Sequence, residues 1–445
     1  MPRRRPALDG RRPRSVDPDS AQPKLRRDHG RVRAMSGIDV AALAAAVEGR
    51  MPMAAALFDE VRGVSVDKVG ITRPAWSEQD QAAADILARA AGDIGLDAAY
   101  DSVGNLCCNL AGKDPAAPAI LIGSHLDSVP TGGHFDGLAG FVAGLVAQAA
   151  LGDIDCTPEC DIVSLGIRGE ESVWFGIPFI GSRLALGSLP HDQLDELRRG
   201  DTGRTLADHM ADVGVDVAAL RGESAPAIAA DGARAFLELH IEQGPILVGE
   251  GVKVAIPTVI RGNVRWPYAH CIGRYDHSGA TPRVYRQDTV LAVAELVHRL
   301  DEFWQVQEAS GAPDTVFTAG KFFTDAAHHG MTKVPGRTDF TLNFGGTTEK
   351  FLDTCRSRVN TLAAEIGARR RVTFELGECV TGAPAPLDPE LRATFEETAY
   401  ALGIETRRFA TVGHDAAEFH RAGIPAAMVL VRNAHGSHNP EEAMD

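Results

Sequence analysis

The stretch that most constrains the fold is residues 119–137, AILIGSHLDSVPTGGHFDG. Its opening residues form a short apolar run with two isoleucines, ended by Gly123, and such a run is typical of a buried strand. Polar residues follow at once, at the carboxyl end of that strand, where open α/β sheets place their ligand crevices. The stretch therefore predicts an α/β protein with a polar site at this edge of the sheet.

Three side chains in this stretch are candidate ligands. His125 and Asp127 lie two residues apart, so on extended backbone they share one face. Asp136 follows after a loop that three glycines make pliable. This arrangement suggests a metal site, because it combines a histidine, a carboxylate behind that histidine and a second carboxylate that the loop brings back. The alternative for these residues alone is an ordinary turn.

Length and composition limit the class of protein. The chain has 445 residues, which exceeds the usual size of a single core, so we expect two domains. It is 44% hydrophobic and 24% charged, and we find no apolar run near the ~18 residues that a membrane helix needs. The formal charge of −15 argues against a nucleic-acid partner. We therefore expect a protein that acts on small molecules, away from membranes.

The first 34 residues differ from the rest in composition. They contain ten Arg and one Lys against four Asp, a net charge of +7, together with several prolines. We predict a disordered basic tail over residues 1–34, with Met35 as a candidate start of the chain. The tail has no hydrophobic segment, so it is not a secretory signal. The seven cysteines are odd in number and form no CxxC pair, which favours reduced thiols and a cytoplasmic location.

Apolar periodicity divides the chain into elements. Up to about residue 261 it predicts helices over 38–62, 78–97 and 137–150, further helices within 190–221, and strands over 98–111, 161–166 and 236–241. Between 262 and 382 it predicts strand 263–273, helix 284–303, strands 314–323 and 338–344, helix 347–366 and strand 371–378, the βαββαβ order of a ferredoxin-like layer. After Pro384 it predicts helices near 388–402 and 415–422 and a strand over 426–431. The resulting fold class is α/β: a catalytic domain in two segments, 35–261 and 383–445, with a ferredoxin-like domain inserted at 262–382.

Further polar motifs fall at predicted strand ends or in loops. Glu170 and Glu171 follow strand 161–166, and adjacent buried carboxylates repel each other unless a cation lies beside them. The alternative is a solvated helix start, which the helix dipole favours. His240 ends an alternating strand, and taken alone it is most simply a core histidine. His277 belongs to a DHSG motif inside the inserted segment, and His438 to a GSHNP motif that is otherwise a turn.

Together these residues predict a centre for two metal ions. If Asp136 bridges, one ion has His125, Asp136 and His240, and the other has Asp136, Glu171 and His438. Nitrogen and oxygen ligands without thiolates suit Zn²⁺, Mn²⁺, Co²⁺ or Ni²⁺. Positions left open on each ion are the mark of a catalytic site, and two ions ~3.5–4 Å apart activate a water and polarise a carbonyl. We therefore expect two divalent ions per subunit.

The order of the motifs GSHLDS, GGHFDG, GEES, HIEQGP, HSGATP and GSHNPEE resembles the metal-dependent amidases of the N-carbamoyl-L-amino acid hydrolase and allantoate amidohydrolase family. These amidases belong to the wider aminoacylase/carboxypeptidase clan, and the resemblance runs from about Gly70 to the end of the chain. It implies the same five metal ligands, with Glu170 as general base and Asp127 as the carboxylate behind the metal site. It also implies that His277 is a carbonyl-polarising histidine, and that the inserted domain is a lid that forms a homodimer.

The chain departs from this family where relatives grip the substrate carboxylate. Thr332 stands where the family usually has an asparagine, and Gly345 where it usually has an arginine. Arg283 replaces the usual methionine of the HSGATP loop. We therefore expect an altered carboxylate pocket, with candidate substrate-binding residues Gln243, Arg283, Arg286 and Thr332. Weak activity on N-carbamoyl-L-α-amino acids would follow.

The expected function is hydrolysis of a non-peptide C–N bond in a linear ureido or amide compound by a two-metal site. One alternative is a dipeptidase or aminoacylase of the same clan. Another is a metal-free binding protein descended from the enzyme, which would have no use for Glu170.

Overall fold

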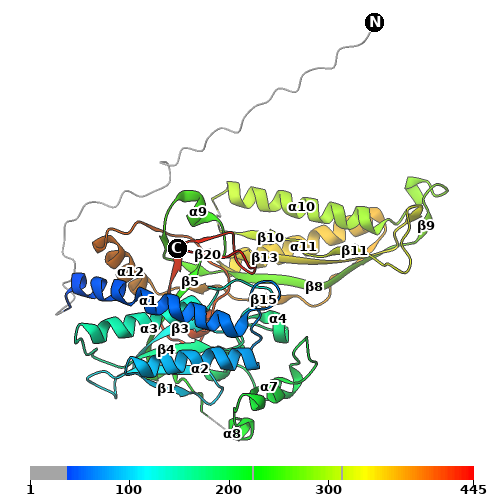
Figure 1. The fold of residues 1–445 in the computed structure, drawn as a ribbon. Coiled ribbons are helices and arrows are strands. Elements are labelled where there is room, and N and C mark those ends of the chain that lie inside the picture. Colours follow the sequence, from blue (N-terminus) through cyan, green and yellow to red (C-terminus); the bar gives the residue numbers. More distant parts are fainter. Residues whose placement is uncertain (1–37, 223–224, 312–313) are drawn as a thin grey trace. The chain divides into compact units, whose positions relative to one another are not determined.

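A computed structural model describes residues 38–222, 225–311 and 314–445 (Figure 1). The predicted basic tail, residues 1–34, lies outside the described residues. Residues 39–445 form one compact unit. Two main sheets organise this unit, an eight-stranded one and a six-stranded one. This arrangement confirms the predicted mixed α/β class.

The eight-stranded sheet has the order β1-β2-β4-β3-β5-β18-β6-β17. Its strands are β1 (Asp97–Tyr100), β2 (Leu106–Leu110), β3 (Ala119–His125), β4 (Ile162–Ile167), β5 (Ala233–Ile241), β6 (Val254–Ala255), β17 (Thr406–Arg407) and β18 (Ala426–Val431). β4, β3, β5 and β18 are neighbours and run parallel. Their carboxyl ends therefore meet at one edge of the sheet, where α/β proteins bind ligands.

Helices cover this sheet and enclose its core. One core cluster joins the sheet to α1 (Val40–Ser65), α2 (Glu78–Asp93) and α3 (Leu138–Asp153), and α3 is rich in Ala and Gly that permit close packing. A second cluster includes residues of α13 (Ala416–Arg421), and α12 (Pro389–Ala401) also contacts β18. Shorter elements are α4 (Ser172–Phe175), α5 (Ile180–Ala185), α6 (Gln193–Glu196), α7 (Leu206–Asp212), α8 (Val217–Gly222), η1 (Ala230–Gly232), α9 (Ile246–Glu250), β7 (Val259–Ile260), β16 (Ala385–Pro386), β19 (Asn433–Ala434) and β20 (Ala443–Met444).

The strand predicted over residues 98–111 was wrong, because this segment is a hairpin of β1 and β2. The carboxylate of Asp101 accepts the backbone N–H of Val103 (3.0 Å) and of Asn105 (2.8 Å). Gly104 has a φ of +89°, which a residue with a side chain rarely adopts. The side-chain hydrogen bonds of Asp101 therefore reverse the chain in the middle of the predicted strand.

The six-stranded sheet lies within residues 262–382. Its main strands are β10 (Val316–Thr318), β13 (Arg337–Gly346), β8 (Gly262–Ile272) and β14 (Thr373–Glu375), in the order β10-β13-β8-β14. β11 (Phe322–Thr324) pairs with β13, and β15 (Val380–Gly382) pairs with β8. Helices α10 (Thr289–Ala309) and α11 (Glu349–Arg370) pack on one face (Figure 1). Numbered along the chain, the order is 2-3-1-4, which is that of a ferredoxin-like layer.

Two predicted boundaries in this segment were wrong. The helix predicted from residue 284 begins at Thr289, because the side chain of Asp288 caps it and a 3₁₀ turn, η2 (Arg283–Tyr285), precedes it. The strand predicted over 314–323 is two strands, β10 and β11. A separate ladder pairs β9 (Asp276–His277) with β12 (Lys333–Val334). The domain limits 35–261, 262–382 and 383–445 stay a prediction.

Helix α1 qualifies the expectation about membranes. Among the described helices it alone is long and apolar enough to span a bilayer by length and composition. Its buried residues Ala54, Leu57, Phe58 and Val61 nevertheless belong to the core cluster shared with α2 and α3. A surface helix that buries one apolar stripe passes the same composition test.

Candidate active site

Three parallel strands deliver the first side chains of the site. His125 is the last residue of β3, and His240 is the last but one of β5. Glu170 and Glu171 follow β4, which lies beside β3. Because these strands are adjacent and parallel, residues far apart in the sequence converge at the same edge of the sheet.

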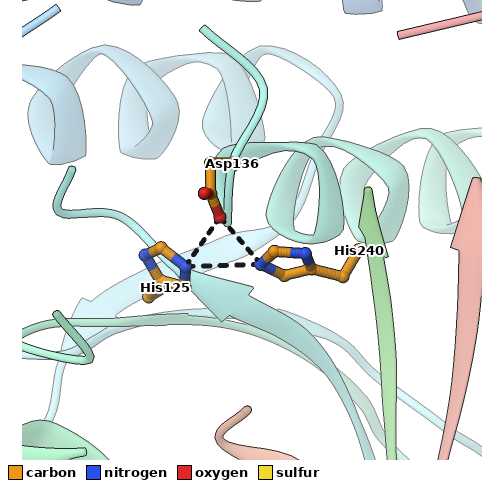
Figure 2. Close-up of side chains that lie close together, drawn as sticks. All are labelled: His125, Asp136 and His240. Atoms are coloured by element: carbon orange, nitrogen blue, oxygen red, sulfur yellow. Dashed lines mark hydrogen bonds and ion pairs between the residues drawn. The ribbon is translucent and has the colours of Figure 1, made fainter. Parts of the chain in front are cut away.

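Asp136 reaches this edge from the loop before α3. Its neighbour Gly137 caps α3 with a φ of +71°. A Cβ at residue 137 would lie 2.4 Å from the ring of His125, so only glycine permits this close approach. Asp136 lies between the rings of His125 and His240, as Figure 2 shows.

His125, Asp136 and His240 form a first ligand group. Asp136 Oδ1 lies 3.1 Å from His240 Nε2 and 3.5 Å from His125 Nε2, and the two Nε2 atoms are 3.4 Å apart. The Nδ1 atoms donate to backbone carbonyls, of Asp127 (2.9 Å) and of Ile241 (3.0 Å). With Nδ1 engaged, each ring faces Asp136 through Nε2, the atom that a metal ion would bind. Asp136 Oδ1 is buried without a hydrogen-bond partner in the described chain, so the donor set fits a cation.

Asp136, Glu171 and His438 form a second group on the other oxygen of the same carboxylate. His438 Nε2 lies 3.4 Å from Asp136 Oδ2 and 3.2 Å from Glu171 Oε1. Asp136 thus presents one oxygen to each group, which is the arrangement of a bridging carboxylate. Burial opposes its ionisation, yet His125 and His240 hold the pKa of Asp136 well below its usual value. Asp136 is therefore a carboxylate that stays ionised between the two groups.

Gln243 and Ser437 complete the surroundings of Asp136. Gln243 Nε2 donates to Asp136 Oδ2 (3.0 Å) and lies 3.4 Å from His438 Nε2, and Ser437 Oγ also donates to Asp136 Oδ2. Glu442 Oε1 lies 2.9 Å from Ser437 Oγ and accepts a hydrogen bond from the backbone N–H of His438 (3.2 Å). Of the predicted substrate-binding residues, Gln243 is the one that lies against the ligand groups.

Asp127 has a role in the structure that its position in the sequence does not reveal. Its carboxylate accepts the backbone N–H groups of Gly169 (2.9 Å), Glu170 (3.1 Å) and Glu171 (3.2 Å). Its Oδ1 lies 3.8 Å from the Nδ1 of His125, which donates to the Asp127 carbonyl instead. Burial raises the pKa of Asp127 to about 6. Asp127 therefore shapes the loop that carries both glutamates.

Glu170 has the properties of a proton acceptor. It lies with Glu171 beside His125. Burial raises the pKa of Glu170 well above its usual value, and repulsion from Glu171, Asp415 and Asp127 adds to this, against the attraction of His125. A raised pKa makes a carboxylate a better proton acceptor than one with an ordinary pKa.

The sequence interpretation missed a polar layer behind His240. The ring of His414 packs on that of His240 with centroids 4.4 Å apart. Glu238 accepts from Ser124 Oγ (2.8 Å) and from the backbone N–H of Ala416 (2.9 Å), and Asp415 accepts from Ser182 Oγ (2.6 Å). Two signals were available. Glu238 shares a strand face with His240, and His414 and Asp415 stand at the start of the helix predicted near 415–422.

His277 lies in the six-stranded region, on β9. Its Nδ1 accepts the backbone N–H groups of Gly279 (3.2 Å) and Ala280 (3.1 Å), so the neutral ring carries its proton on Nε2. The side chain is exposed, and within the described chain its hydrogen bonds stay inside its own loop. The structure therefore does not bring His277 to the ligand groups.

The remaining predicted substrate-binding residues lie in this loop or, for Thr332, against it. The carbonyl of Thr332 accepts the N–H of Ser278 (2.9 Å). The guanidinium of Arg286 donates to the carbonyls of Thr281 (2.8 Å) and Ser278, so it braces the loop. Arg283 is exposed at the start of η2. None of these three is in contact with the ligand groups among the residues that the structure describes.

Comparison with known proteins identifies the family. The model of Peptidase family M20/M25/M40 matches residues 121–445. The chain belongs to this family.

Within the M20/M25/M40 family the chain is similar to amidohydrolases. It is 33% identical over 388 residues to an N-carbamoyl-L-amino-acid amidohydrolase of Paenarthrobacter aurescens, covering 87% of this chain and 91% of the relative. It is 29% identical to the allantoate amidohydrolase of Escherichia coli over 84% of this chain and 88% of the relative. A solved hydantoinase/carbamoylase family amidase from Burkholderia multivorans superposes with a TM-score of 0.78 at 26% identity, covering 91% of this chain and 93% of the amidase. These matches confirm the resemblance inferred from the motifs, and the chain is a hydrolase of this family.

Proposed function

We propose that the protein is a two-metal amidohydrolase that cleaves a non-peptide C–N bond in a linear ureido or amide compound. The observation that carries this proposal is Asp136, whose two oxygens face separate groups of nitrogen and oxygen ligands. The activities for which the related N-carbamoyl-L-amino-acid and allantoate amidohydrolases are named support the substrate class.

Two divalent ions fit the two ligand groups. His125, Asp136 and His240 would hold one, and Asp136, Glu171 and His438 the other. The absence of thiolates from both groups favours Zn²⁺, Mn²⁺, Co²⁺ or Ni²⁺. When bound, such ions lower the pKa of a water and polarise a carbonyl oxygen.

Glu170 and His277 supply the proton chemistry. Glu170 takes a proton from the attacking water and passes it to the leaving nitrogen, so one carboxylate serves as base and then as acid. Asp127 accepts the backbone N–H groups of residues 169–171 and thereby orients Glu170. His277, with its proton on Nε2, donates a hydrogen bond to the oxygen that becomes negative in the transition state.

We further propose that the protein is a homodimer in a reducing compartment, the cytoplasm. The side chain of His277 is exposed within its own loop. It is therefore free to contribute to the active site of another subunit. The seven cysteines are all free, as expected where thiols stay reduced.

The test is a substrate panel with metal-loaded protein. We expect release of ammonia or amine from N-carbamoyl amino acids, allantoate or simple linear amides, and its loss in Glu170→Gln. Dipeptides and N-acyl amino acids form the comparison arm for a dipeptidase or aminoacylase. If only dipeptides or N-acyl amino acids are hydrolysed, the protein is a dipeptidase or an aminoacylase. Hydrolysis of no compound would contradict the proposal.

A further inference from the structure

The second ligand group depends on a turn whose backbone is strained. His435, Gly436 and His438 have positive φ angles of +69°, +75° and +61°. A residue with a side chain keeps such a conformation only where surrounding contacts enforce it. The side chain of His438 is also 49% exposed, whereas those of His125 and His240 are buried. The position of His438 therefore depends on the contacts that hold its turn.

One buried carboxylate, that of Glu442, joins this turn to the loop that carries Asp136. Its Oε1 accepts the backbone N–H of His438 (3.2 Å), and its Oε2 accepts the backbone N–H of Phe135 (3.2 Å). Phe135 directly precedes Asp136, so each oxygen of Glu442 holds one ligand loop at or next to a candidate ligand. Ser437 lies between the two loops, because its Oγ is 2.9 Å from Glu442 Oε1 and donates to Asp136 Oδ2.

The loop of Asp136 leaves room for this carboxylate. A Cβ at residue 133 would overlap the carboxylate of Glu442, so the space that Glu442 fills exists because Gly133 has no side chain. Gly133 thus has a packing role in addition to making the loop pliable. The contact between the two loops is therefore closely fitted as well as hydrogen-bonded.

A short hairpin holds Glu442 itself in place. Glu442 directly precedes β20, which pairs with β19. The buried side chain of Asn433, at the start of β19, accepts the backbone N–H of Ala443 (2.9 Å) and donates to the carbonyl of Gly436 (2.7 Å). One amide therefore fixes both the residue after Glu442 and the strained turn.

We propose that Glu442 is a positioning residue that holds Asp136 and His438 at the spacing that the second ion requires. This inference rests on the proposed two-metal site. The first ligand group depends less on Glu442, because His125 and His240 lie at strand ends and their rings are buried. Loss of the Glu442 carboxylate therefore weakens the second ion selectively.

Two parent variants isolate the two ion positions in a calorimetric titration with Zn²⁺. His240→Ala leaves the second ligand group intact and His438→Ala leaves the first, and each parent receives Glu442→Ala, Glu442→Gln or the control Glu441→Ala. The side chain of Glu441 is exposed, so its substitution removes an equal charge and keeps the contact between the loops.

In the His240→Ala parent, we expect Glu442→Ala to weaken Zn²⁺ binding by roughly 10–100-fold, the usual cost of losing a group that orients a metal ligand. In the His438→Ala parent, the same change should leave the affinity for Zn²⁺ nearly unaltered. Glu442→Gln should have an intermediate effect, because its amide keeps one of the two acceptor oxygens. Glu441→Ala should have no effect in either parent.

Hydrogen–deuterium exchange of the metal-free protein separates this inference from the proposed function, because it requires neither metal nor turnover. Glu442→Ala should speed exchange in the peptides that contain Phe135 and His438, whose N–H groups lose their acceptor, and Glu441→Ala should not. Faster exchange in both segments supports the inference even if the protein hydrolyses nothing. Unchanged exchange at Phe135, or equal Zn²⁺ affinity of the His240→Ala parent with and without Glu442→Ala, would overturn it and leave the hydrolase assignment intact.

Discussion

The ligand groups and the His277 loop are held in different ways. His125, Asp136 and His240 are 2%, 5% and 1% exposed, and strand ends and a glycine turn fix them. His277 is exposed and is held by two backbone N–H groups of its own loop. The first region is preorganised by the sheet, whereas the position of the second relative to a substrate depends on contacts outside its loop. Substitutions in the first region should change metal binding, and substitutions in the second should change turnover alone.

The largest effect is expected for Asp136→Ala. Because one carboxylate faces both ligand groups, its loss should remove both ions together and reduce activity to background. Metal content by mass spectrometry after loading and desalting measures this, with His277→Ala as the matched control that keeps its metal. Retention of two ions per chain in Asp136→Ala would show that Asp136 does not bridge.

Glu170→Gln should lower kcat by roughly 10²–10⁴, the usual contribution of general acid–base catalysis. The amide is isosteric with the carboxylate but accepts no proton, so metal content should stay at the wild-type value. Steady-state kinetics on the best compound of the panel, alongside metal analysis, checks both statements. Near wild-type kcat would remove Glu170 from the mechanism.

His277→Ala should lower kcat by roughly 10²–10³, as for other donors to a developing oxyanion. Metal content and thermal stability should not change, because the loop lies apart from the ligand groups. Mixing His277→Ala chains with Glu170→Gln chains should restore activity if His277 serves the other subunit of a dimer. If subunit exchange is verified and activity stays absent, His277 acts in its own chain or outside the reaction.

The smallest effect is expected for Asp415→Asn, in the layer behind His240. Burial, with repulsion from Glu238, raises the pKa of Asp415 to about 8 from an ordinary 3.8. Between pH 3.8 and about pH 8, Asp415 is ionised in the unfolded chain but still protonated in the folded, metal-free protein. The free energy of unfolding therefore falls as the pH rises through this range. Asp415→Asn should flatten that slope in denaturant titrations at several pH values. An unchanged slope would show that other titrating groups cause the pH dependence of stability.

The sequence was sufficient for the part of the site that sheet topology controls. Short apolar runs at 119–122 and 161–166 and the alternating pattern at 236–241 predict strands. Parallel neighbours bring the residues that follow such strands to one edge of the sheet. That rule is enough to bring His125, Glu171 and His240 close together. Asp136 was predicted because glycines mark the loop that returns it. His438 was predicted from its motif after the final strand, for which the alternative was a turn.

Other features depend on tertiary contacts that local patterns do not encode. Glu238 and Asp415 become a polar layer only because β5, β18 and α13 pack together, although the two residues are 177 positions apart (415 − 238). The hairpin at 97–110 depends on side-chain bonds of Asp101 that override an apolar pattern. Asn343 lies opposite Arg265 only through the register of β13 and β8, and register is invisible in a single sequence.

The central claim is that one carboxylate organises two metal positions, and metal stoichiometry tests it most directly. The purified protein is stripped with a chelator, reloaded separately with Zn²⁺, Mn²⁺, Co²⁺ or Ni²⁺, and desalted. Its metal content is then measured by mass spectrometry beside that of the His240→Ala and His438→Ala variants. We predict two ions per chain in the wild type for at least one metal, and one ion per chain in each variant. One ion or none in the fully loaded wild type with every metal would contradict the account.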